Sequence, residues 1–401
     1  MTDETPTLSC VTEFIVDCLH KTAPIQETGF PLIRTPNIGK GRFNLDGVYR
    51  ISQETYDKWT IRAVPQKNDL IMAREAPAGN VAIIKSDEPH CLGQRTVHIR
   101  PNPELIDPDF LTYFLVAPRQ QAALLKNQIG VHVGHVNMKD IRKLPLEDLP
   151  PMEEQMKRAQ IISKYDDLIE NNKRRIELLE ESARQLYKEW FVRFRFPGHE
   201  HVKIIDGVPD GWKKTTADQA IEILSGGTPK TKVPDYWNGD ISFYTPKDST
   251  NTVYVSDTEK TITSLGLEKC ASKLYPKDTL FITARGTVGK LNLAQKPMAM
   301  NQSCYALVGK EPVNQIYLFF AMQAGIQQVK SRAVGAVFDA IIKDTFKVIP
   351  FVVPPERLID EFTDYAEPIL KQIDCLLSST EKLTQARDIL LPKLMSGEIA
   401  V

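Results

Sequence analysis

The chain has 401 residues, of which 42% are hydrophobic and 25% are charged. This length allows two or three domains with separate cores, and no apolar run reaches the roughly 18 residues that a membrane span requires. The net charge of -1 counts mildly against nucleic-acid binding, although the 50 Lys and Arg side chains could still gather on one face.

The first ten residues, MTDETPTLSC, are polar and acidic and lack the layout of a secretory signal. The six cysteines are scattered and form no CxxC pair, which favours reduced thiols. We therefore expect an unexported, cytoplasmic protein.

The first half of the chain reads as a globular domain followed by a helix. Residues 1–151 alternate apolar stretches with turn residues, which predicts a mixed domain with several strands and one helix near 108–127. Residues 152–194 contain no proline or glycine and predict one long helix.

The second half repeats this order. Residues 197–212 are rich in Gly, Pro and His and predict a linker; strand-like runs follow, then a helical stretch near 312–332 and a helical tail over 355–397. The predicted segments are therefore 1–151, 152–196, 197–354 and 355–401.

The long helix carries an apolar heptad seam, which indicates that it needs a partner helix. Asn172 is the polar break in this seam, and we interpret it as fixing the register, with water-filled packing as the alternative. The positions of the first seam that we expect to pack are Ile162, Ile169, Asn172, Ile176, Leu179 and Leu186.

The two halves match each other in constant order, which predicts an internal repeat. Near the end of each globular part the offset is 204 residues, and it holds into the helices. The matched pairs are Thr35-Pro36 with Thr245-Pro246, Ile51-Ser52 with Ile262-Thr263, Arg74 with Arg285, Gln94 with Gln302, and Lys139-Asp140 with Lys343-Asp344.

The tail has the same heptad phase as the first helix, so the simplest structure pairs the two helices within one chain. Because the termini of a compact domain often lie close together, the second helix should run back along the first. We predict an α+β fold, in which two tandem mixed α/β domains are separated and joined by two long helices in an antiparallel coiled coil, with a pseudo-two-fold internal repeat. The tail seam comprises Ile369, Ile373, Leu376, Leu383 and Leu390.

Catalytic motifs are missing from the sequence. It contains no GxxxxGK[ST] loop, no GxSxG elbow and no acidic-x-lysine element of the kind that many nucleases use. The histidine pairs His199 with His201 and His132 with His135 lack further ligands at zinc spacing, so we expect no metal site.

The duplicated polar positions are better functional candidates. Arg74 and Arg285 each follow a strand-like run, and an arginine suits bidentate contact with a phosphate or a guanine edge. Gln94 and Gln302 suit adenine readout. The alternative is that each Arg makes an internal ion pair and each Gln caps a turn.

Specific base contacts should fall where the halves differ. These stretches are 37–50 against 225–240, and 75–90 against 286–297, and they mix Lys and Arg with Asn, Thr, Tyr, Trp and Gly. Surface loops have a similar composition, so this pattern is only suggestive.

Several segments carry a family likeness: NNKRRIELLEESARQLYKEWFVRFRFPG, SGGTPKT with YWNGDISFYTPKD, ITARGTVGKL with MNQSCYAL, and RDILLPKLMSGEI. With these segments the whole chain resembles the specificity subunit of type I restriction-modification enzymes. The first half departs from the second, with HKTAP and AREAPAG in place of SGGTP and ARGTVG, as expected if the two units read different DNA.

The resemblance implies a non-catalytic subunit with two target recognition domains, each reading one half of a bipartite double-stranded DNA target. The helices would set the spacer and dock two methyltransferase subunits, and restriction subunits would join through these. S-adenosylmethionine, Mg²⁺ and ATP would belong to the partner subunits, and this chain would need no cofactor. The alternatives are a protein scaffold with duplicated interaction domains that never contacts DNA, and an enzyme, which the missing motifs disfavour.

The candidate DNA-contact residues share a polar side chain at a matched or divergent loop position. They are Thr35, Asn37, Lys40, Arg42, Arg74, Gln94, Lys139, Thr228, Lys230, Thr245, Lys247, Arg285, Gln302 and Lys343.

Overall fold

The structure is a computed structural model that describes residues 5–126, 134–332 and 340–401. The chain forms two compact units. Unit 1 comprises Met1–Asn171 with Thr380–Val401, and unit 2 comprises Asn172–Ser379. Each unit therefore contains one globular domain with part of each long helix.

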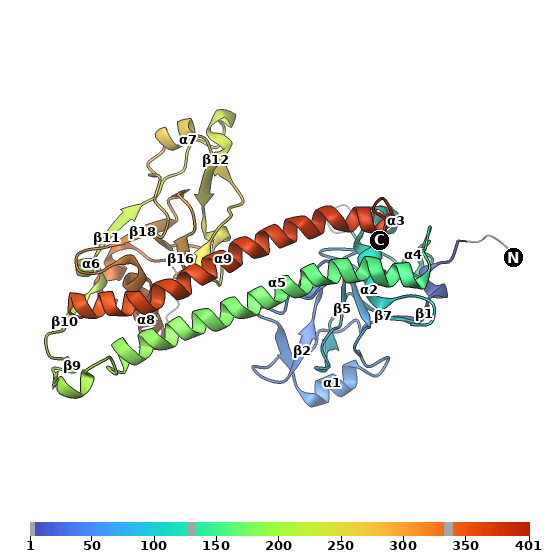
Figure 1. Cartoon of the computed structure of the whole chain (residues 1–401), viewed down its shortest axis with the longest axis horizontal. Coiled ribbons are helices and arrows are strands. Elements are labelled where there is room, and N and C mark those ends of the chain that lie inside the picture. The colour runs from blue at the N-terminus through green and yellow to red at the C-terminus, as the bar shows by residue number, and fades with distance from the viewer. Residues whose placement is uncertain (1–4, 127–133, 333–339) are drawn as a thin grey trace. The chain divides into compact units, whose positions relative to one another are not determined.

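The domain of unit 1 is built on two sheets (Figure 1). The larger has the strand order β1-β7-β4-β5, and the smaller has the order β3-β2-β6. The strands are β1 (Thr12–Asp17), β2 (Phe30–Ile33), β3 (Tyr49–Ile51), β4 (Leu70–Ala73), β5 (Val81–Ile83), β6 (Cys91–Leu92) and β7 (Thr96–Pro101).

The domain of unit 2 repeats both sheets. Its larger sheet has the order β11-β18-β15-β16-β13, and its smaller sheet has the order β14-β12-β17. These strands are β11 (Ile221–Ser225), β12 (Trp237–Tyr244), β13 (Tyr254–Val255), β14 (Thr261–Ile262), β15 (Leu280–Thr283), β16 (Leu291–Ala294), β17 (Met298–Met300) and β18 (Cys304–Gly309).

Strand directions repeat as well as strand order. In the small sheets, β2 pairs antiparallel with β3 and parallel with β6, while β12 pairs antiparallel with β14 and parallel with β17. One further pair, β10 (Lys213–Thr216) with β19 (Pro350–Val353), closes the second domain. The predicted internal repeat is confirmed.

Short helices cover the sheets at matching places. Helices α1 (Gln53–Trp59) and α7 (Ser264–Glu268) are N-capped by Ser52 and Thr263, whose hydroxyls accept the backbone N–H of Thr55 and Gly266. The remaining short helices are α2 (Pro108–Val116), α3 (Pro118–Leu125), α4 (Met138–Arg142), α6 (Ala217–Ala220) and the longer α8 (Gln315–Arg332).

The single helix predicted near 108–127 is two helices. Ala117 has an extended backbone, with φ -65° and ψ 146°, directly before Pro118. A proline disfavours the helical conformation in the residue that precedes it, so α2 ends there and α3 begins at Pro118.

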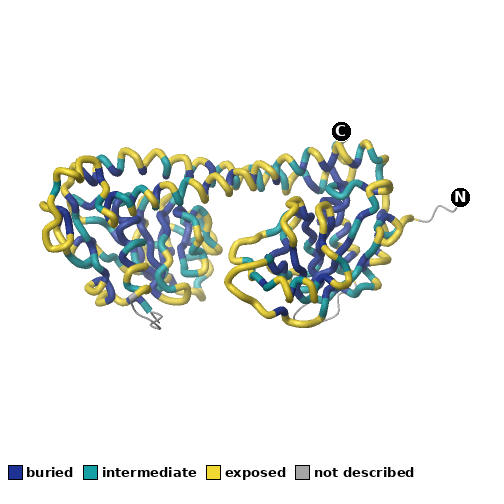
Figure 2. The backbone as a smooth tube through the Cα atoms, turned by 90° about the horizontal axis from the view of Figure 1, so that it is seen from below, coloured by how far each residue is buried: buried dark blue, intermediate teal, exposed yellow. Residues whose placement is uncertain are grey.

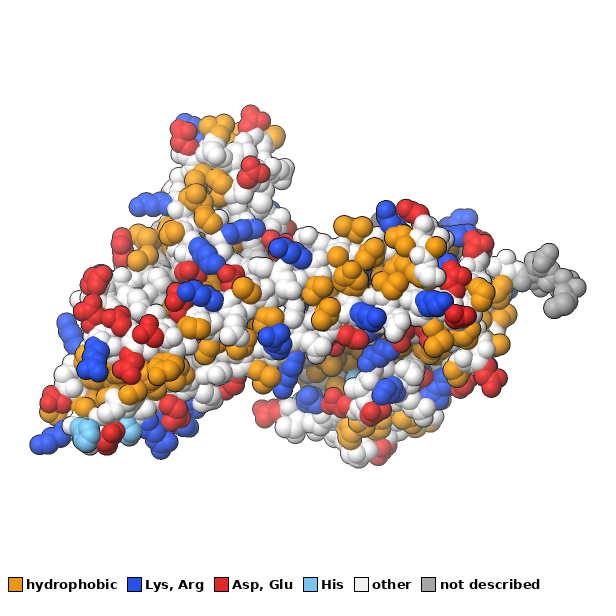
Figure 3. Space-filling model, viewed as in Figure 1, with side chains coloured by type: hydrophobic (Ala, Val, Ile, Leu, Met, Phe, Trp, Pro, Cys, Tyr) orange, Lys and Arg blue, Asp and Glu red, His pale blue; other side chains and the backbone are white. Residues whose placement is uncertain are grey.

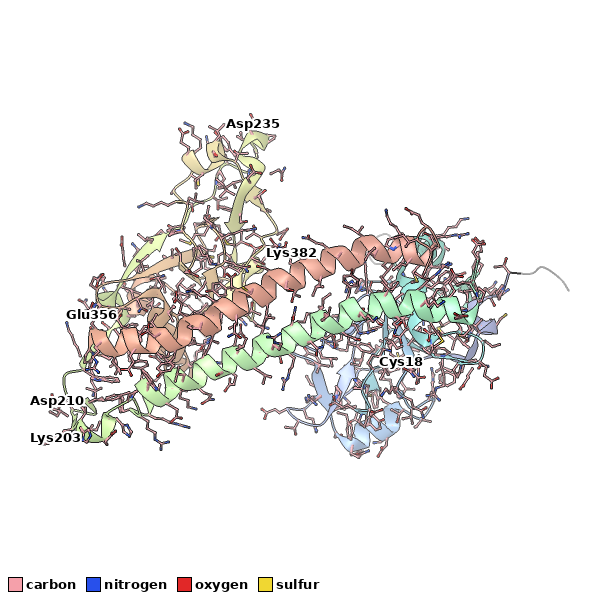
Figure 4. The ribbon with its side chains drawn as sticks, in the orientation of Figure 1. Cys18, Lys203, Asp210, Asp235, Glu356 and Lys382 are labelled. Carbon is pink, nitrogen blue, oxygen red and sulfur yellow. The ribbon has the colours of Figure 1, made fainter. Side chains whose placement is uncertain are left out.

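The two predicted long helices are present. Helix α5 spans Met152–Tyr187 and continues as a π-helical turn over Lys188–Val192, and α9 spans Glu356–Met395. The segment between α5 and β10 contains a small hairpin, β8 (Ile204–Ile205) with β9 (Val208–Pro209), which Lys203 and Asp210 flank (Figure 4). Within the described residues, no helix is long and apolar enough to cross a membrane.

The helices pair in opposite directions within each unit. In unit 1 the start of α5 meets the end of α9, where the Arg158 guanidinium donates to the Met395 carbonyl at 3.4 Å. In unit 2 the end of α5 meets the start of α9, where the rings of Tyr187 and Trp190 pack against Phe362. This is the predicted antiparallel arrangement.

The helix seams are buried where they face the domain cores (Figure 2). In α5, Ile162, Asn172 and Ile176 are buried, whereas Leu179 and Leu186 are half-buried. In α9, Ile373 and Leu376 are buried, as the heptad predicts. Further along, the predicted positions Leu383 and Leu390 are only half-buried. The buried residues at the end of α9 are instead Leu391, Leu394 and Met395. A straight helix of 3.6 residues per turn drifts from a seven-residue repeat in this way. Ile169 is buried and Ile369 is half-buried.

A buried ion pair joins both helices to the first domain. Asp166 on α5 has a side chain that is 1% exposed, and Arg387 on α9 donates to its Oδ1 at 2.7 Å. Tyr113 on α2 donates to its Oδ2 at 2.8 Å. Burial, and then the adjacent Asp166 carboxylate, raise the pKa of Tyr113 far above its ordinary value, which keeps this phenol a hydrogen-bond donor.

The repeat replaces this ion pair with apolar residues. With the offset of 204 residues, Asp166 corresponds to Leu370 and Arg387 corresponds to Ala183. Both are buried in unit 2, with exposures of 1% and 0%. The same position of the helix pair is therefore charged in one unit and apolar in the other.

We predict that Arg387→Ala destabilises unit 1 by about 3 kcal/mol, because it leaves the Asp166 carboxylate buried without its cation. The double variant Asp166→Leu with Arg387→Ala copies the apolar pair of unit 2 and should recover most of this loss. Urea denaturation midpoints measure both effects.

Arg174→Ala is the matched control, because Arg174 is an exposed arginine of α5 that pairs with the exposed Glu177 three residues further on. It should change stability by less than about 0.5 kcal/mol. Equal stability of Arg387→Ala and the control would contradict the assigned role of the ion pair.

Candidate nucleic-acid interface

Four loops of unit 2 meet at one edge of its sheets. We call 226–232, 245–252, 284–290 and 301–303 the second loop edge. The Thr287 hydroxyl donates to the Pro246 carbonyl at 3.0 Å, and Lys290 donates to Asn251. The backbone N–H of Ala284 donates to the Ser303 carbonyl at 2.8 Å. These contacts fix the loops against one another.

The second loop edge is basic. It contains five Lys and Arg residues against one acid, Asp248, whereas the whole chain has a net charge of -1. Asp248 is used internally, because its carboxylate accepts from the backbone N–H groups of Thr245 and Glu259 at 2.8 and 2.7 Å. Elsewhere the charges mix: on the face in Figure 3, Lys and Arg side chains are interspersed with Asp and Glu. Local positive charge of this kind suits contact with phosphates.

Arg285 follows β15 on this edge and is exposed. It begins a tight hairpin loop in which Gly286 and Gly289 have φ of 78° and 79°, values that a side chain would strain. The backbone N–H of Gly289 donates to the Thr283 carbonyl at 2.9 Å, which closes the loop. A closed loop with an outward guanidinium can approach a nucleic acid groove.

Unit 1 has a corresponding edge. We call 20–24, 34–42, 74–80 and 93–95 the first loop edge. The Asn80 side chain donates to the Ile38 carbonyl at 2.9 Å, and Gly79 N–H donates to the Ala73 carbonyl at 2.8 Å. The loop after β4 is thus closed in the same way as the loop after β15.

The hydrogen bonds correct one of the matched pairs. Arg74 N–H donates to the Arg95 carbonyl, and the Arg74 carbonyl accepts from Val136. In unit 2 the equivalent bonds belong to Ala284, which donates to Ser303 and accepts from Ile341. Arg74 therefore corresponds to Ala284, and Arg285 corresponds to Glu75. The sequence match was wrong by one residue.

Two other matches shift by one residue for the same reason. The backbone N–H of Arg34 is capped by the Asn37 side chain, as that of Thr245 is by Asp248, so Arg34 rather than Thr35 corresponds to Thr245. The third shift lies near Lys139 and Lys343. The N–H of Asp140 donates to the Asn137 carbonyl, and the N–H of Thr345 donates to the Ile342 carbonyl in the same way. Asp140 therefore corresponds to Thr345.

Arg74 is buried and serves the fold of unit 1. Its Nε donates to the Val136 carbonyl at 3.0 Å, and its Nη2 contacts His135 Nε2 at 2.5 Å. Arg74 is therefore internal, and these contacts are hydrogen bonds to a carbonyl and a histidine rather than the ion pair of the alternative interpretation. Arg285 has an exposed side chain and is the one that can reach a ligand.

Gln94 and Gln302 occupy equivalent places, as predicted. Gln94 donates to the Thr22 hydroxyl at 3.3 Å, and Gln302 accepts from the Thr228 hydroxyl. Each amide therefore links the loop after β6 or β17 to the loop after β1 or β11. Thr228 and Gln302 are exposed on the second loop edge.

Two further candidates of unit 1 are held inside the protein. Asn37 is 7% exposed, and its amide donates to the Asn44 carbonyl at 3.0 Å while its oxygen caps Arg34. Arg42 donates to Asp167 on α5 at 3.2 Å with a side chain that is 11% exposed. These two residues shape the edge. Thr35 and Thr245 are half-buried, and Thr245 caps its own turn through Asp248.

The lysine candidates are all exposed. They are Lys40, Lys139, Lys230, Lys247 and Lys343. Lys230 and Lys247 lie on the second loop edge and Lys40 on the first, whereas Lys139 and Lys343 lie in α4 and in the 3-10 turn Lys343–Lys347. Their exposure fits phosphate contact without selecting it over plain solvation.

Glu75, Arg95 and His135 form one cluster, in which the first loop edge contacts His135. The sequence had suggested Glu75 only within the divergent stretch 75–90 and His135 only as a metal candidate, and Arg95 was missed. Glu75 pairs with Arg95 at 2.7 Å and with His135 at 2.9 Å. A correct strand register would have pointed to Glu75 as the equivalent of Arg285. Contacts across sixty residues, as between Glu75 and His135, leave no local signal.

In the described part of the chain, no group of three His, Cys, Asp or Glu side chains is placed to hold a metal ion. His199 and His201 lie near Glu200 in a short 3-10 turn. His132 lies outside the described residues.

Comparison with known protein families found one whose model matches both globular domains. The family model described as the type I restriction modification DNA specificity domain matches residues 18–181 and 209–361. The chain belongs to this family. The two matches fall on the two globular domains and enter the helix that follows each of them, so the family model and the structural repeat agree.

Curated relatives share modest identity with this member of the family. It is 29% identical over 198 residues to the MjaIX specificity subunit of Methanocaldococcus jannaschii, an alignment that covers 47% of this chain and 46% of that one. It is 22% identical over 400 residues to the HindI specificity subunit of Haemophilus influenzae, covering 83% and 87%. The chain therefore spans about half of the first relative and most of the second.

A solved structure shares the fold. The type I restriction-modification S subunit from M. genitalium aligns with a TM-score of 0.57 at 16% sequence identity, covering 98% of this chain and 95% of that one. At this identity the likeness concerns the fold.

The two arginines should respond differently to truncation. Arg74→Ala leaves the Val136 carbonyl and His135 without their buried donor and should destabilise unit 1 by about 2 kcal/mol. Arg285→Ala should change stability by less than about 0.5 kcal/mol. Thermal unfolding of the two variants measures this difference, and an equal loss in both would show that Arg285 is also part of the fold.

Proposed function

We propose that this chain is the non-catalytic, DNA-reading subunit of a type I restriction-modification system. Each globular domain reads one half of a bipartite duplex target through its loop edge. The paired helices α5 and α9 set the distance between the halves and dock two methyltransferase subunits.

The observation that carries this proposal is the duplicated loop edge. The same two sheets present the same closed loops twice, and in the second copy these loops carry five Lys and Arg against one internally bonded Asp. Two similar domains can each bind one half of a target that has two separate halves. Because the loop side chains differ between the domains, the two halves can differ in base sequence.

The helices supply the spacer. At about 1.5 Å per residue, the 36 residues of α5 span roughly 54 Å and the 40 residues of α9 roughly 60 Å. Half-sites one DNA turn apart are separated by about 34 Å. Each helix is therefore long enough to span the distance between two half-sites.

The outer faces of the helices supply the docking surfaces. Met156, Leu168 and Leu178 on α5 are 55%, 50% and 54% exposed, and Tyr365 and Ile389 on α9 are 57% and 64% exposed. Apolar side chains exposed on a helix favour contact with a partner protein. We assign these faces to the methyltransferase subunits.

The chemistry lies outside this chain in this proposal. Restriction subunits join through the methyltransferase complex, and S-adenosylmethionine, Mg²⁺ and ATP bind to the partner subunits. The whole complex acts in the cytoplasm, where the chromosome is found. A protein scaffold that never contacts DNA would have no need of a basic edge.

Bound to its methyltransferase partner, the chain should protect a bipartite duplex, and the affinity should fall as salt rises because phosphate contacts release counterions. Footprinting on a library of duplexes at 50 and 200 mM salt measures both properties. Protection that ignores both sequence and salt would support the scaffold instead.

Lengthening both helices by one heptad should widen the gap between half-sites and leave each half unchanged. Seven residues inserted after Asn171 and after Ser379, where the compact units divide, add about 10.5 Å, or about three base pairs of duplex. Sequencing of methylated sites in cells measures the spacing.

A four-residue insertion at the same two positions is the control. It interrupts the seven-residue repeat of each seam at the insertion point and should weaken the packing of α5 on α9, whereas a whole heptad continues the repeat. If the heptad insertion altered the recognised bases and left the gap unchanged, the proposed role of the helices in setting the spacer would be wrong.

A further inference from the structure

We propose that Arg95 reads a guanine in the first half-site and that Glu75 is its positioning residue. This inference rests on the proposed DNA-reading function and deepens it, because it names the side chain and the base. Three observations at the first loop edge carry it, and two comparisons with other arginines support it.

Arg95 has the placement of a reader. It lies in the turn between β6 and β7 with a backbone φ of 65°, and its side chain is 60% exposed. Its carbonyl accepts the N–H of Arg74, so the turn is fixed to the loop after β4. The guanidinium therefore projects from a fixed backbone at the rim of the sheets.

Glu75 holds this guanidinium in one direction. Its Oε2 lies 2.7 Å from Arg95 Nη1, and its carboxylate is only 16% exposed. One nitrogen of Arg95 makes this ion pair, and a guanidinium carries five N–H donors. Enough donors remain for the bidentate contact with guanine O6 and N7.

Glu75 is itself fixed from behind. His135 Nδ1 lies 2.9 Å from Glu75 Oε1, and Arg74 Nη2 lies 2.5 Å from His135 Nε2. An arginine can only donate, so His135 Nε2 accepts and its Nδ1–H donates to Glu75. Arg74 also donates to the Val136 carbonyl, which fixes its own position. A continuous series of hydrogen bonds therefore runs from Val136 through Arg74, His135 and Glu75 to the exposed guanidinium of Arg95.

An ordinary surface ion pair looks different. Arg119 is 57% exposed and pairs with Asp148 at 2.7 Å and with Glu147, but these two carboxylates are 78% and 50% exposed. Pairs of that kind contribute at most about 1 kcal/mol and need no further support. The hydrogen bonds from Arg74 through His135 to Glu75 fit a requirement for a fixed direction of the Arg95 side chain.

The second domain places its guanidinium differently. There Arg285 stands at the position of Glu75, and Ser303 stands at the position of Arg95. Each edge thus presents one outward arginine, from the turn after β6 in unit 1 and from the loop after β15 in unit 2. The two domains therefore read a guanine at different places in their half-sites.

The test maps methylated motifs in cells that express the chain with its methyltransferase, comparing the wild type with Arg95→Ala, Glu75→Gln, Arg285→Ala and Arg119→Ala. Arg95→Ala should relax one guanine of the first half-site, with discrimination falling roughly 10- to 100-fold. Glu75→Gln should relax the same base less strongly. Arg285→Ala should relax the second half-site only, and Arg119→Ala should change neither.

Stability and salt dependence separate the alternatives. Thermal unfolding of Arg95→Ala should match that of Arg119→Ala, so a relaxed base cannot follow from a damaged fold. Unchanged motifs in Arg95→Ala would overturn the inference. So would a uniform loss of affinity for all duplexes with a salt slope smaller by about one, which marks a phosphate contact. If the wild type itself shows no split motif, the proposed function fails, and the inference fails with it.

Discussion

The first unit depends on one buried carboxylate. Asp166 accepts hydrogen bonds from Arg387 of α9 and from Tyr113 of α2, so a single side chain of α5 fixes both the second helix and the first globular domain. Gly41 is required beside it, because a Cβ there would lie 3.2 Å from the carboxylate oxygen at a backbone φ of 96°. An isolated buried charge is costly, so the helix pair and the domain must assemble together to satisfy it.

Much of this architecture could be predicted from the sequence. The heptads located both helices, because a seam of apolar residues leaves a periodic signal. The antiparallel direction followed from the expected closeness of the termini of the domain that connects the helices. The repeat was found from a few matched residues, and capping residues such as Ser52 and Thr263 matched because they serve equivalent helices. The break at Pro118 was missed, since the apolar pattern of α2 and α3 continues across it.

The candidate site could be predicted only in part. Matching Arg74 to Arg285 followed residue type, whereas the backbone hydrogen bonds place Arg74 opposite Ala284. A shift of one residue changes which side chain faces outward, so an error of this size decides whether the matched residue is a buried structural arginine or an exposed candidate for DNA contact. The relay behind Glu75 joins segments sixty residues apart, and such contacts leave no trace in local sequence.

The exchange of Asp166 and Arg387 for Leu370 and Ala183 has a consequence for self-association. Two copies of the first half alone would pair their helices with Asp166 opposite Ala183, and two copies of the second half would set Leu370 opposite Arg387. A homodimer of the first half would leave two Asp166 carboxylates buried without the Arg387 cation, whereas the two halves together supply this pair. The ion pair therefore disfavours a symmetric dimer of the first half, because only the two different halves bring Asp166 and Arg387 into contact.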